Sequence, residues 1–340
     1  MTLRIFDALP PYFGGKRRLV GAIFRHIPPP SEAPVFADAF LGGGSVALYA
    51  KARGYAVRCN DLAERSVLVG RALIANDRVT LTAEDVLRLF APAHDAGRLA
   101  RDRLAPGVIT ARHAEFLDVA MAHARRVDGI KGDLLRLLLV QYLYRQRPMG
   151  NFGARSITEQ VDDGDWDAVN ATFLRGNWLD RVHGHPRANC DALRDRINRG
   201  VFAGAQPCEV HQGDAAEFLA RVEADVAYLD PPYAGTLAYE TALRPVDELL
   251  AGHAIEPERS RHSSPDWRDA LLRLFDAARH IPRWVLSFNN AATSLDELVG
   301  LMRRFKPRVE AEAIAYDHCA SLANATTRER NREFLIIGSD

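Results

Sequence analysis

Hydrophobic and polar positions divide the chain into two stretches of alternating pattern with a different stretch between them. In the first, an apolar run over residues 35–40 breaks into three glycines, helical spacing covers residues 45–53, and a second apolar run covers residues 55–59. An amphipathic segment over residues 15–27, predicted to be a helix and stopped by three prolines, precedes them. Strand, glycine turn, helix and strand form a βαβ unit, which predicts a parallel sheet.

The alternation resumes in the last third of the chain. Strands are predicted over residues 208–211, 225–229, 284–288, 309–315 and 333–337, and helices over residues 215–222, 267–279 and 295–305. Between the two stretches the sequence shows only helical spacing, over residues 84–90, 110–126 and 132–144. The predicted fold is therefore one Rossmann-like α/β domain, residues 1–64 and 206–340, split by a helical insertion, residues 65–205.

Charge and hydropathy limit the classes of protein that need to be considered. The 340 residues carry 44 Lys and Arg against 44 Asp and Glu, so the formal net charge is zero. This balance argues mildly against a nucleic-acid partner, although a local basic face matters more than the sum. The most apolar stretch, residues 134–144, is interrupted by Arg136 and Gln141 and is too short to span a bilayer. The N-terminal residues lack a secretory signal pattern, so the cytoplasm is the expected compartment.

Cysteine and histidine positions do not predict a metal site. The cysteines are far apart and form no Cys-x-x-Cys pair: Cys59, Cys190, Cys208 and Cys319. His183 and His185 lie near Cys190 in the sequence, but no fourth ligand follows at a suitable spacing. We therefore expect neither a metal nor a disulfide framework.

The glycine turn has the pattern of a nucleoside-binding loop. Gly42, Gly44 and Ala47 form a G-x-G-x-x-A motif between a strand and a helix, and Asp61 ends the next strand. Glycines let the backbone approach a ligand, and a carboxylate at that place can accept hydrogen bonds from both ribose hydroxyls. Asp38, just before the turn, would repel a pyrophosphate and attract a cofactor with ammonium and sulfonium groups. This charge pattern favours S-adenosylmethionine over a dinucleotide.

A second motif, Asp230-Pro231-Pro232-Tyr233, ends a predicted apolar strand. Two prolines cannot continue a strand ladder, so the chain leaves the sheet as a rigid loop where α/β sheets place their chemistry. The carboxylate of Asp230 and the carbonyl of Pro231 can accept the two hydrogens of an exocyclic amino group, and Tyr233 can stack on the base. A base in a duplex must be turned out of the helix to reach such a pocket.

Together, these residues resemble the Dam-type DNA adenine-N6 methyltransferases. The similarity rests on the aromatic-x-Gly-Gly-Lys segment at residues 12–16, the acidic-x-Phe-x-Gly-x-Gly-Ser segment at residues 38–45, Asp61, and the motif at residues 230–233. It implies a Rossmann-like, S-adenosylmethionine-dependent methyltransferase fold with a helical target-recognition insertion. It also implies methylation of adenine N6 in double-stranded DNA, with a cognate restriction endonuclease as partner in a restriction-modification system.

Three groups of site residues follow. The cofactor-binding residues implied by the resemblance are Tyr12, Phe13, Gly15, Lys16, Asp38, Phe40, Gly42, Gly44, Ser45, Asp61, Asp214 and Asp230. The catalytic residues expected are Asp230, Pro231, Pro232 and Tyr233. A locally basic loop is the candidate for contacts with phosphates and base edges, and its residues are Arg145, Arg147, Asn151 and Arg155.

Other interpretations of the same residues stay open. A nicotinamide-dependent oxidoreductase would account for Gly42 and Asp61 but leaves residues 230–233 and the upstream Gly-Gly-Lys without a role. A methyltransferase for cytosine N4, RNA adenine or a protein glutamine amide would share the fold. Cytosine enzymes more often have Ser where Asp230 stands, and glutamine enzymes Asn, so the family resemblance favours adenine. A non-catalytic, helical DNA-binding protein with a degenerate cofactor domain would not explain the intact set of motifs.

Overall fold

The contacts of the computed structural model divide the chain into two compact units. The sheet unit consists of Tyr12–Gly70, Ala203–Tyr239 and Glu258–Asp340, and the helical unit of Met1–Pro11, Arg71–Phe202 and Glu240–Pro257. The structure describes residues 4–12, 14–105, 108–146, 152, 185–233, 239–256, 260–316 and 331–340.

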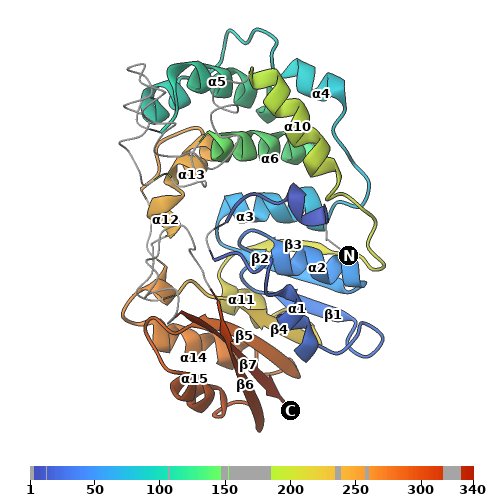
Figure 1. Ribbon diagram of the computed structural model, residues 1–340, viewed down its shortest axis with the longest axis vertical. Coiled ribbons are helices and arrows are strands. Elements are labelled where there is room, and N and C mark those ends of the chain that lie inside the picture. Colours follow the sequence, from blue (N-terminus) through green and yellow to red (C-terminus); the bar gives the residue numbers. More distant parts are fainter. Residues whose placement is uncertain are drawn as a thin grey trace. The chain divides into compact units, whose positions relative to one another are not determined.

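Within these described residues, seven strands form one sheet in the order β3-β2-β1-β4-β5-β7-β6 (Figure 1). The strands are β1 (Val35–Asp38), β2 (Ala56–Asp61), β3 (Glu209–Gln212), β4 (Val226–Leu229), β5 (Arg283–Asn289), β6 (Arg308–Ala315) and β7 (Arg332–Ser339). Neighbours are parallel except at β7, which runs antiparallel between β5 and β6. Without β7 the order is that of the doubly wound nucleotide-binding sheets. The predicted Rossmann-like α/β fold is confirmed.

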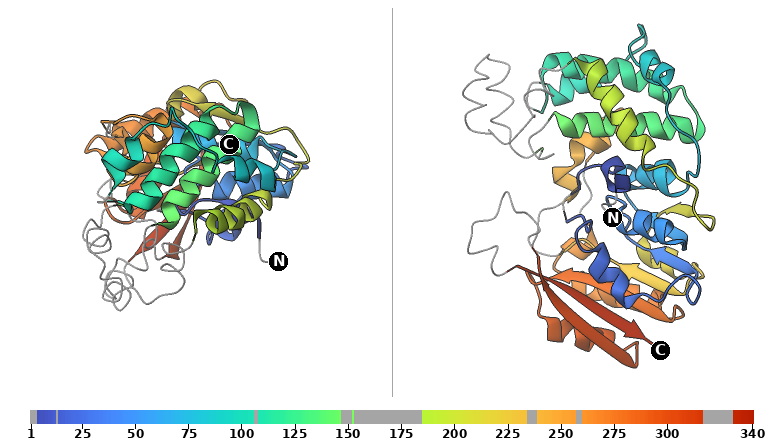
Figure 2. Two further views of the ribbon diagram at one scale, coloured as in Figure 1. Left: turned by 90° about the horizontal axis from the view of Figure 1, so that it is seen from above. Right: turned by 45° about the vertical axis from the view of Figure 1, so that its right-hand side comes forward.

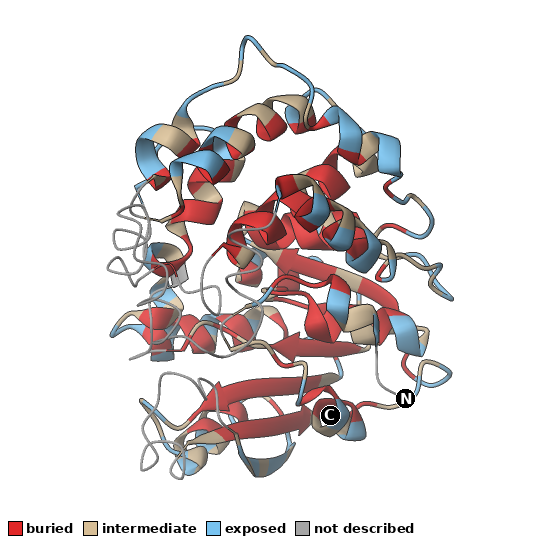
Figure 3. Ribbon diagram, turned by 45° about the horizontal axis from the view of Figure 1, so that its top comes forward, coloured by how far each residue is buried: buried red, intermediate tan, exposed pale blue. Residues whose placement is uncertain are grey.

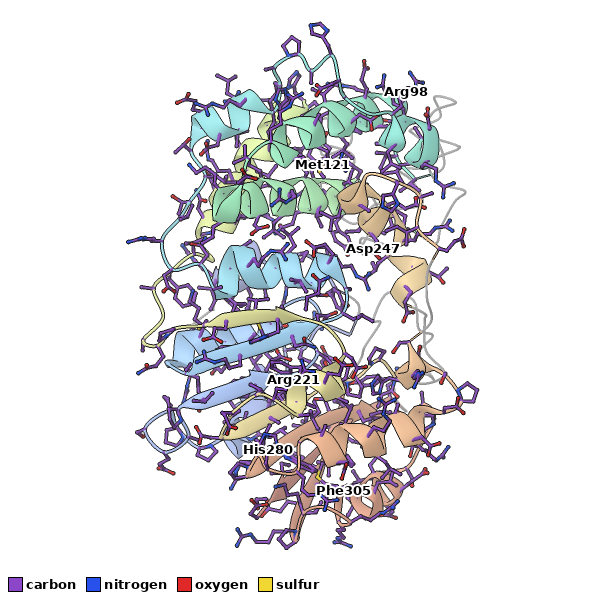
Figure 4. All side chains as sticks on the ribbon, turned by 180° about the vertical axis from the view of Figure 1, so that it is seen from behind. Arg98, Met121, Arg221, Asp247, His280 and Phe305 are labelled. Carbon is purple, nitrogen blue, oxygen red and sulfur yellow. The ribbon has the colours of Figure 1, made fainter. Side chains whose placement is uncertain are left out.

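The central strands are short and apolar because both faces of the sheet are covered. All of β4 is buried, and only Val35 of β1 is partly exposed (Figure 3). On one face, Ala227 and Trp284 belong to a core that also contains residues of α11 (Ala215–Leu219), α14 (Trp267–Ala277) and α15 (Leu295–Met302). Phe305, after α15, packs on Trp284 with 6.4 Å between ring centroids (Figure 4).

The opposite face carries the side chains of alternate strand residues, as the two-residue period of a strand requires. There Phe36 of β1 contacts the rings of Phe24, Tyr55 and Tyr228. Helices α1 (Val20–Ile23) and α2 (Ser45–Arg53) pack near this aromatic cluster, since Phe24 directly follows α1 and also contacts Tyr49 of α2. Asp38, two residues after Phe36, shares this face.

Local sequence signals explain where the helices of the sheet unit begin and end. Helix α2 begins after Gly44 and ends before Gly54, both with a positive φ angle, which favours glycine, and its bounds match the prediction. The side chains of Asp214 and Ser294 accept backbone N–H groups at the starts of α11 and α15. Helix α3 (Glu64–Val69) follows β2.

The helix predicted over residues 15–27 is shorter than expected. The chain turns over residues 17–19, and only α1 (Val20–Ile23) and a 3-10 turn (Phe24–His26) are helical. Gly14 has a φ angle of +69°, and the ammonium of Lys16 donates to the Gly14 carbonyl at 3.0 Å. The Gly-Gly-Lys segment is therefore a loop rather than a first helical turn.

The last two strands form a long antiparallel pair at one end of the sheet (Figure 2). β7 is buried along most of its length because it lies between β5 and β6, whereas the edge strand β6 is largely exposed. Glu333 in β7 is opposite Asn289, the last residue of β5. This register carries an acidic residue of β7 to the edge of the sheet where β5 ends.

The helical unit contains α4 (Ala83–Arg88), α5 (Ala111–Arg125), α6 (Gly129–Arg145), α10 (Pro186–Asn198) and α13 (Arg244–Ala251), and α12 (Tyr239–Ala242) precedes α13 in the chain. Helix α6 is buried over most of its circumference and packs against α5, α10 and α13. Met121 of α5 belongs to this core (Figure 4). Short 3-10 or π-helical segments are Arg4–Ala8, Gly70–Ile74, Ala100–Leu104 and Arg261–Ser263. Among the described helices, none has the length and apolar character that crossing a membrane requires.

Candidate active site

Acidic residues follow four neighbouring parallel strands at their carboxyl ends. Asp38 ends β1, Asp61 ends β2, Asp214 follows β3 and Asp230 follows β4. Because the four strands are parallel and adjacent, their carboxyl ends share one edge of the sheet. Open α/β sheets bind their ligands outside this edge.

The glycine loop after β1 is held by the acid that ends β2. The backbone N–H of Gly42 donates to Asp61 Oδ2 at 2.8 Å, and that of Ala63 donates to Asp61 Oδ1 at 2.9 Å. Burial raises the pKa of Asp61, and these two N–H groups partly offset that rise because they stabilise the carboxylate. Asp61 thus orders the glycine loop while its carboxyl group stays at the sheet edge.

Tyr12 packs closely against the glycine loop. A Cβ atom on Gly43 would lie 2.7 Å from Cβ of Tyr12, and one on Gly42 would lie 3.2 Å from the Tyr12 ring. Gly42 also has a φ angle of +52°, which disfavours other residues. These glycines therefore allow the Tyr12 side chain to lie closer to the loop than any side chain at their positions would permit.

We expect Gly43→Ala to lower the free energy of unfolding by about 1–3 kcal/mol, because the new methyl group overlaps Tyr12. Urea denaturation measures this change. The matched control is Gly300→Ala, because Gly300 lies in α15 and a Cβ there meets nothing within 4 Å. That control should be neutral or stabilising, since alanine has the higher helix propensity. Equal destabilisation by both substitutions would contradict the close packing.

Asn60, near the end of β2, joins two of the loops at the sheet edge. Its side-chain amide donates to the carbonyl of Ala39 at 3.3 Å and to that of Gly213 at 3.1 Å. The backbone of Leu41 in turn donates to the Asn60 carbonyl at 2.9 Å. The loops after β1 and β3 are therefore tied to the end of β2 by a residue that is 1% exposed.

Asp38 is the most deeply buried of the four acids, with 1% of its surface exposed. Burial raises its pKa to about 8, and the negative charge of Asp230 adds to the rise. The backbone N–H of Phe40 donates to Asp38 Oδ1 at 3.3 Å, which compensates only in part. A positively charged group placed next to Asp38 would favour its ionised form.

Around Asp230, two carboxylates share two donors. Lys16 Nζ lies 2.9 Å from Asp230 Oδ2 and 3.4 Å from Glu333 Oε1. The Tyr233 hydroxyl lies 2.8 Å from Asp230 Oδ1 and 2.8 Å from Glu333 Oε1. Burial raises the pKa of Asp230, the charge of Glu333 raises it further, and Lys16 lowers it. Asp230 keeps 19% of its side chain exposed, so it remains accessible.

Aromatic rings cover the inner side of this cluster. The centroid of the Phe288 ring lies 5.0 Å from that of Tyr233 and 5.4 Å from that of Trp267. Tyr233 is 5% exposed, and Lys16 Nζ lies 5.0 Å from its ring centroid. Stacking of Tyr233 on a base stays a prediction, because in this structure its ring packs inside the protein.

Other predicted residues take less central places at the same edge. Phe40 is half-buried and contacts the His262 ring edge-on at 5.3 Å. Gly15 accepts a hydrogen bond from the Tyr316 hydroxyl at 3.0 Å, and Ser45 is buried at the start of α2. Asp214 is exposed, and its side chain accepts the N–H groups that begin α11. Pro231 is buried and Pro232 is half-buried in the loop after β4.

The structure adds site residues that the sequence did not identify. Glu333 lies in β7 and Tyr316 directly follows β6, and both contact the Gly-Gly-Lys loop. His262 lies beside Phe40, and burial lowers its pKa to about 4, so its ring is neutral near pH 7. One sequence feature could have identified Glu333 as a site residue: it is an acid at the start of a predicted strand that is otherwise apolar up to Gly338.

The predicted nucleic-acid residues belong to other parts of the chain. Arg147, Asn151 and Arg155 lie outside the described residues, as does the predicted cofactor residue Phe13. Arg145 ends α6 in the helical unit and donates to the Asn189 carbonyl at 3.5 Å. Contact of this loop with nucleic acid stays a prediction.

Many basic residues of the helical unit are paired with acids of the same unit. Lys131 lies 2.8 Å from Asp85, and Arg136 lies 2.9 Å from Asp133. Arg194 pairs with Asp191 and Asp195, and Arg126 pairs with Asp95. Acids of the same unit therefore offset part of the positive charge of this arginine-rich segment.

The antiparallel β7, the glycine loop held by Asp61 and the Asp-Pro-Pro-Tyr loop at one sheet edge define a methyltransferase of the Rossmann-like fold. Residues 12–95 match the family model of the D12 class N6 adenine-specific DNA methyltransferases. A curated relative, the Type II methyltransferase M2.HphI of Haemophilus parahaemolyticus, is 24% identical over 343 residues, which cover 96% of each chain. These matches support the resemblance: the chain is a DNA adenine-N6 methyltransferase and is similar to the D12 class.

A solved structure was also matched. The rRNA methyltransferase aviRa from Streptomyces viridochromogenes aligns with 98% of this chain and 88% of its own, at 13% identity and a TM-score of 0.32. This similarity is too low to bear on fold or function.

Proposed function

We propose that the sheet unit transfers a methyl group from S-adenosylmethionine to N6 of an adenine that is turned out of double-stranded DNA. One observation carries the proposal. Asp230, the acceptor for the target amino group, follows β4, and β4 is the direct neighbour of β1, which leads into the glycine loop. Donor site and acceptor site are therefore adjacent at one sheet edge.

The residues of the glycine loop suit a cationic cofactor. S-adenosylmethionine supplies a methyl group on a positively charged sulfur. Asp61 would accept hydrogen bonds from the ribose hydroxyls, and Asp38 would attract the positive charges; the position of both acids at the ends of β2 and β1 supports these roles. The pyrophosphate of a dinucleotide would instead meet the carboxylates of Asp61 and Asp230 and would bring no positive charge to favour ionised Asp38, which disfavours the oxidoreductase interpretation.

The Asp230 loop suits the target amino group. The N6 lone pair is delocalised into the adenine ring, so the nitrogen is a weak nucleophile. Two acceptors, the Asp230 carboxylate and the Pro231 carbonyl, would bind its hydrogens and direct the lone pair toward the methyl group. As N6 gains the methyl group it loses one proton, and Asp230, whose pKa is raised, is placed to hold that proton.

The decisive test is incubation with methyl-labelled S-adenosylmethionine and mixed genomic DNA, followed by nucleoside mass spectrometry. We expect N6-methyladenine from duplex DNA. N4-methylcytosine as the product, or label in RNA only, would overturn the proposal. Repetition with single-stranded DNA of the same sequences measures the preference for a duplex.

We expect Asp61→Ala to raise the KM for S-adenosylmethionine by roughly 10- to 100-fold before it lowers the maximal rate. The reason is the loss of charge-assisted hydrogen bonds to the ribose. Steady-state kinetics with varied cofactor concentration measures the effect. The control Asp61→Asn keeps an acceptor for the Gly42 N–H and separates loop order from ribose binding. A fall in maximal rate at unchanged KM would contradict the assigned role.

We further propose that the helical insertion, residues 65–205, recognises the target sequence, with the Arg145–Arg155 loop in contact with DNA. The enzyme would act in the cytoplasm as part of a restriction-modification system, which the name of the Type II relative supports. We expect that replacing residues 65–205 by the corresponding segment of a relative changes the preferred DNA sequence and leaves methyl transfer intact.

A further inference from the structure

Lys16, Asp230, Tyr233 and Glu333 form a closed ring of contacts at the site. The donors Lys16 and Tyr233 each contact both carboxyl groups, at 2.9 and 3.4 Å for the ammonium and at 2.8 Å twice for the hydroxyl. Lys16 is 3% exposed and Glu333 is 0% exposed. The ring is therefore shielded from water at three of its four members.

The number of protons in this ring constrains its chemistry. A tyrosine hydroxyl has one proton, so Tyr233 can donate to only one of the two carboxyl groups at a time. The phenol oxygen can also accept a hydrogen bond. Its contact with the second carboxyl group at 2.8 Å is therefore favourable when that carboxyl group is protonated and donates to the phenol oxygen. The two distances of 2.8 Å therefore favour an arrangement in which Asp230 and Glu333 together hold one carboxyl proton.

We propose that Glu333 is a positioning residue for Asp230: through Lys16 and Tyr233 it fixes the orientation of the Asp230 carboxyl group and shares one proton with it. When the proton is on Glu333, Asp230 is ionised and can accept a hydrogen of the target amino group, beside the Pro231 carbonyl. Glu333 is contributed by the antiparallel strand β7, so that strand has a direct part in the site. The catalytic role of Glu333 rests on the proposed function.

Other charged and titratable groups face Asp230 as well. Lys16 approaches from the loop before α1, Asp38 from the end of β1, and Tyr228 from β4. Tyr233 belongs to the same loop as Asp230, and Tyr316 follows β6. Of this set, Glu333 is the carboxyl group that contacts both of the donors bound to Asp230. Its replacement should therefore act on Asp230 more strongly than any change farther away.

The test is Glu333→Gln, which keeps the size and one acceptor oxygen but can hold neither the charge nor the shared proton. The titration of Asp230 is followed by ¹³C-carboxyl NMR in the intact protein, with Asp230→Asn to assign the signal. We expect the Asp230 midpoint to fall by about one pH unit or more, because a neighbouring negative charge is removed. The acid limb of the pH–rate profile should move in the same direction, with the maximal rate retained within about tenfold.

Two further variants make the result specific. Glu310→Gln removes an exposed carboxylate from the neighbouring strand β6 and should leave the Asp230 midpoint unchanged. Glu333→Asp keeps the charge on a shorter side chain, so it should keep a raised midpoint while the rate falls. An unchanged Asp230 midpoint in Glu333→Gln, or a uniform loss of rate at every pH, overturns the inference. The NMR titration requires no turnover, so failure of the wild-type enzyme to methylate DNA would refute the proposed function separately.

Discussion

Asp230→Ala is expected to lower the single-turnover rate of methyl transfer by about 10²- to 10⁴-fold, the range typical of a lost proton acceptor or charge stabiliser. The substitution removes the group that accepts the N6 hydrogens and holds the released proton. It also removes the negative charge that contributes to the raised pKa of Asp38. Cofactor affinity should therefore become less dependent on pH, and at saturating cofactor the chemical step should fail.

The fold should tolerate this loss. Lys16 keeps Glu333 Oε1 at 3.4 Å and the Gly14 carbonyl at 3.0 Å as partners, so no buried ammonium is left without an acceptor. The Tyr233 hydroxyl likewise keeps Glu333 at 2.8 Å. Asp230 is itself a desolvated carboxyl group, and its removal relieves part of that cost.

The measurements are the rate of labelled methyl transfer at saturating cofactor and the affinity for duplex DNA by fluorescence anisotropy. Asp230→Asn is the matched control. Its side chain keeps one carbonyl oxygen as an acceptor, but its NH2 group would face the hydrogens of the target amino group. We expect it to be impaired less than Asp230→Ala or comparably, with DNA affinity near that of wild type in both. A parallel loss of DNA affinity and turnover would show that Asp230 acts in binding rather than in the reaction.

The sequence predicted the sheet and its chemistry where local signals suffice. Short apolar runs that end in glycine, aspartate or proline gave β1, β2 and β4 with small errors, and α2 was predicted to the residue because glycines bound it on both sides. The acids at strand ends could be placed at one edge because parallel neighbours share their carboxyl ends. Local pattern was enough for these features.

What could not be predicted depends on pairing between distant segments. Residues 333–337 were predicted to be a strand, but no local signal shows that β7 inserts antiparallel between β5 and β6. For that reason Glu333 looked like an acid at the start of an apolar run rather than a partner of Lys16 and Tyr233. The raised pKa of Asp38 likewise needs the burial and the charge of Asp230, which is far away in sequence.

The helical part shows a different limit. Helix α10 (Pro186–Asn198) was not predicted as a separate helix, because its apolar positions are few among charged residues. In the structure, Arg187 and Arg194 pair with Asp191 at helical spacing, and Cys190, Leu193 and Ile197 form its narrow buried stripe. A strongly charged segment can thus be an ordered helix when one thin face is covered by neighbouring helices.

The second large effect is expected for Asp38→Asn, which should stabilise the protein as pH rises and weaken binding of S-adenosylmethionine. The folded-state pKa of Asp38 is about 8, against an ordinary value of 3.8. A group with a raised pKa contributes stability that is complete below its unfolded pKa and is lost as pH rises through its folded pKa. The wild-type protein should therefore lose stability between about pH 4 and pH 8, by at most about 1.4 kcal/mol per pH unit from this residue.

Asparagine at position 38 removes this pH-dependent loss of stability because its side chain is neutral at every pH. The difference in free energy of unfolding, Asp38→Asn minus wild type, should grow over the same window and level off above about pH 8. Urea denaturation at a series of pH values without cofactor measures it. The control Asp269→Asn replaces an exposed carboxylate of α14 and should show no such growth.

Asp38→Asn should stabilise the protein but lower its affinity for the cofactor. The ammonium and sulfonium groups of S-adenosylmethionine favour ionised Asp38, so the affinity of the wild-type protein should rise toward pH 8, by up to about tenfold per pH unit, with one proton released on binding. Calorimetry in two buffers of different ionisation enthalpy counts that proton. In Asp38→Asn the affinity should be low and the proton release absent. If the variant bound the cofactor as tightly as wild type at pH 8, Asp38 would not contact its positive charges, and the choice of a cationic cofactor over a dinucleotide would lose its physical basis.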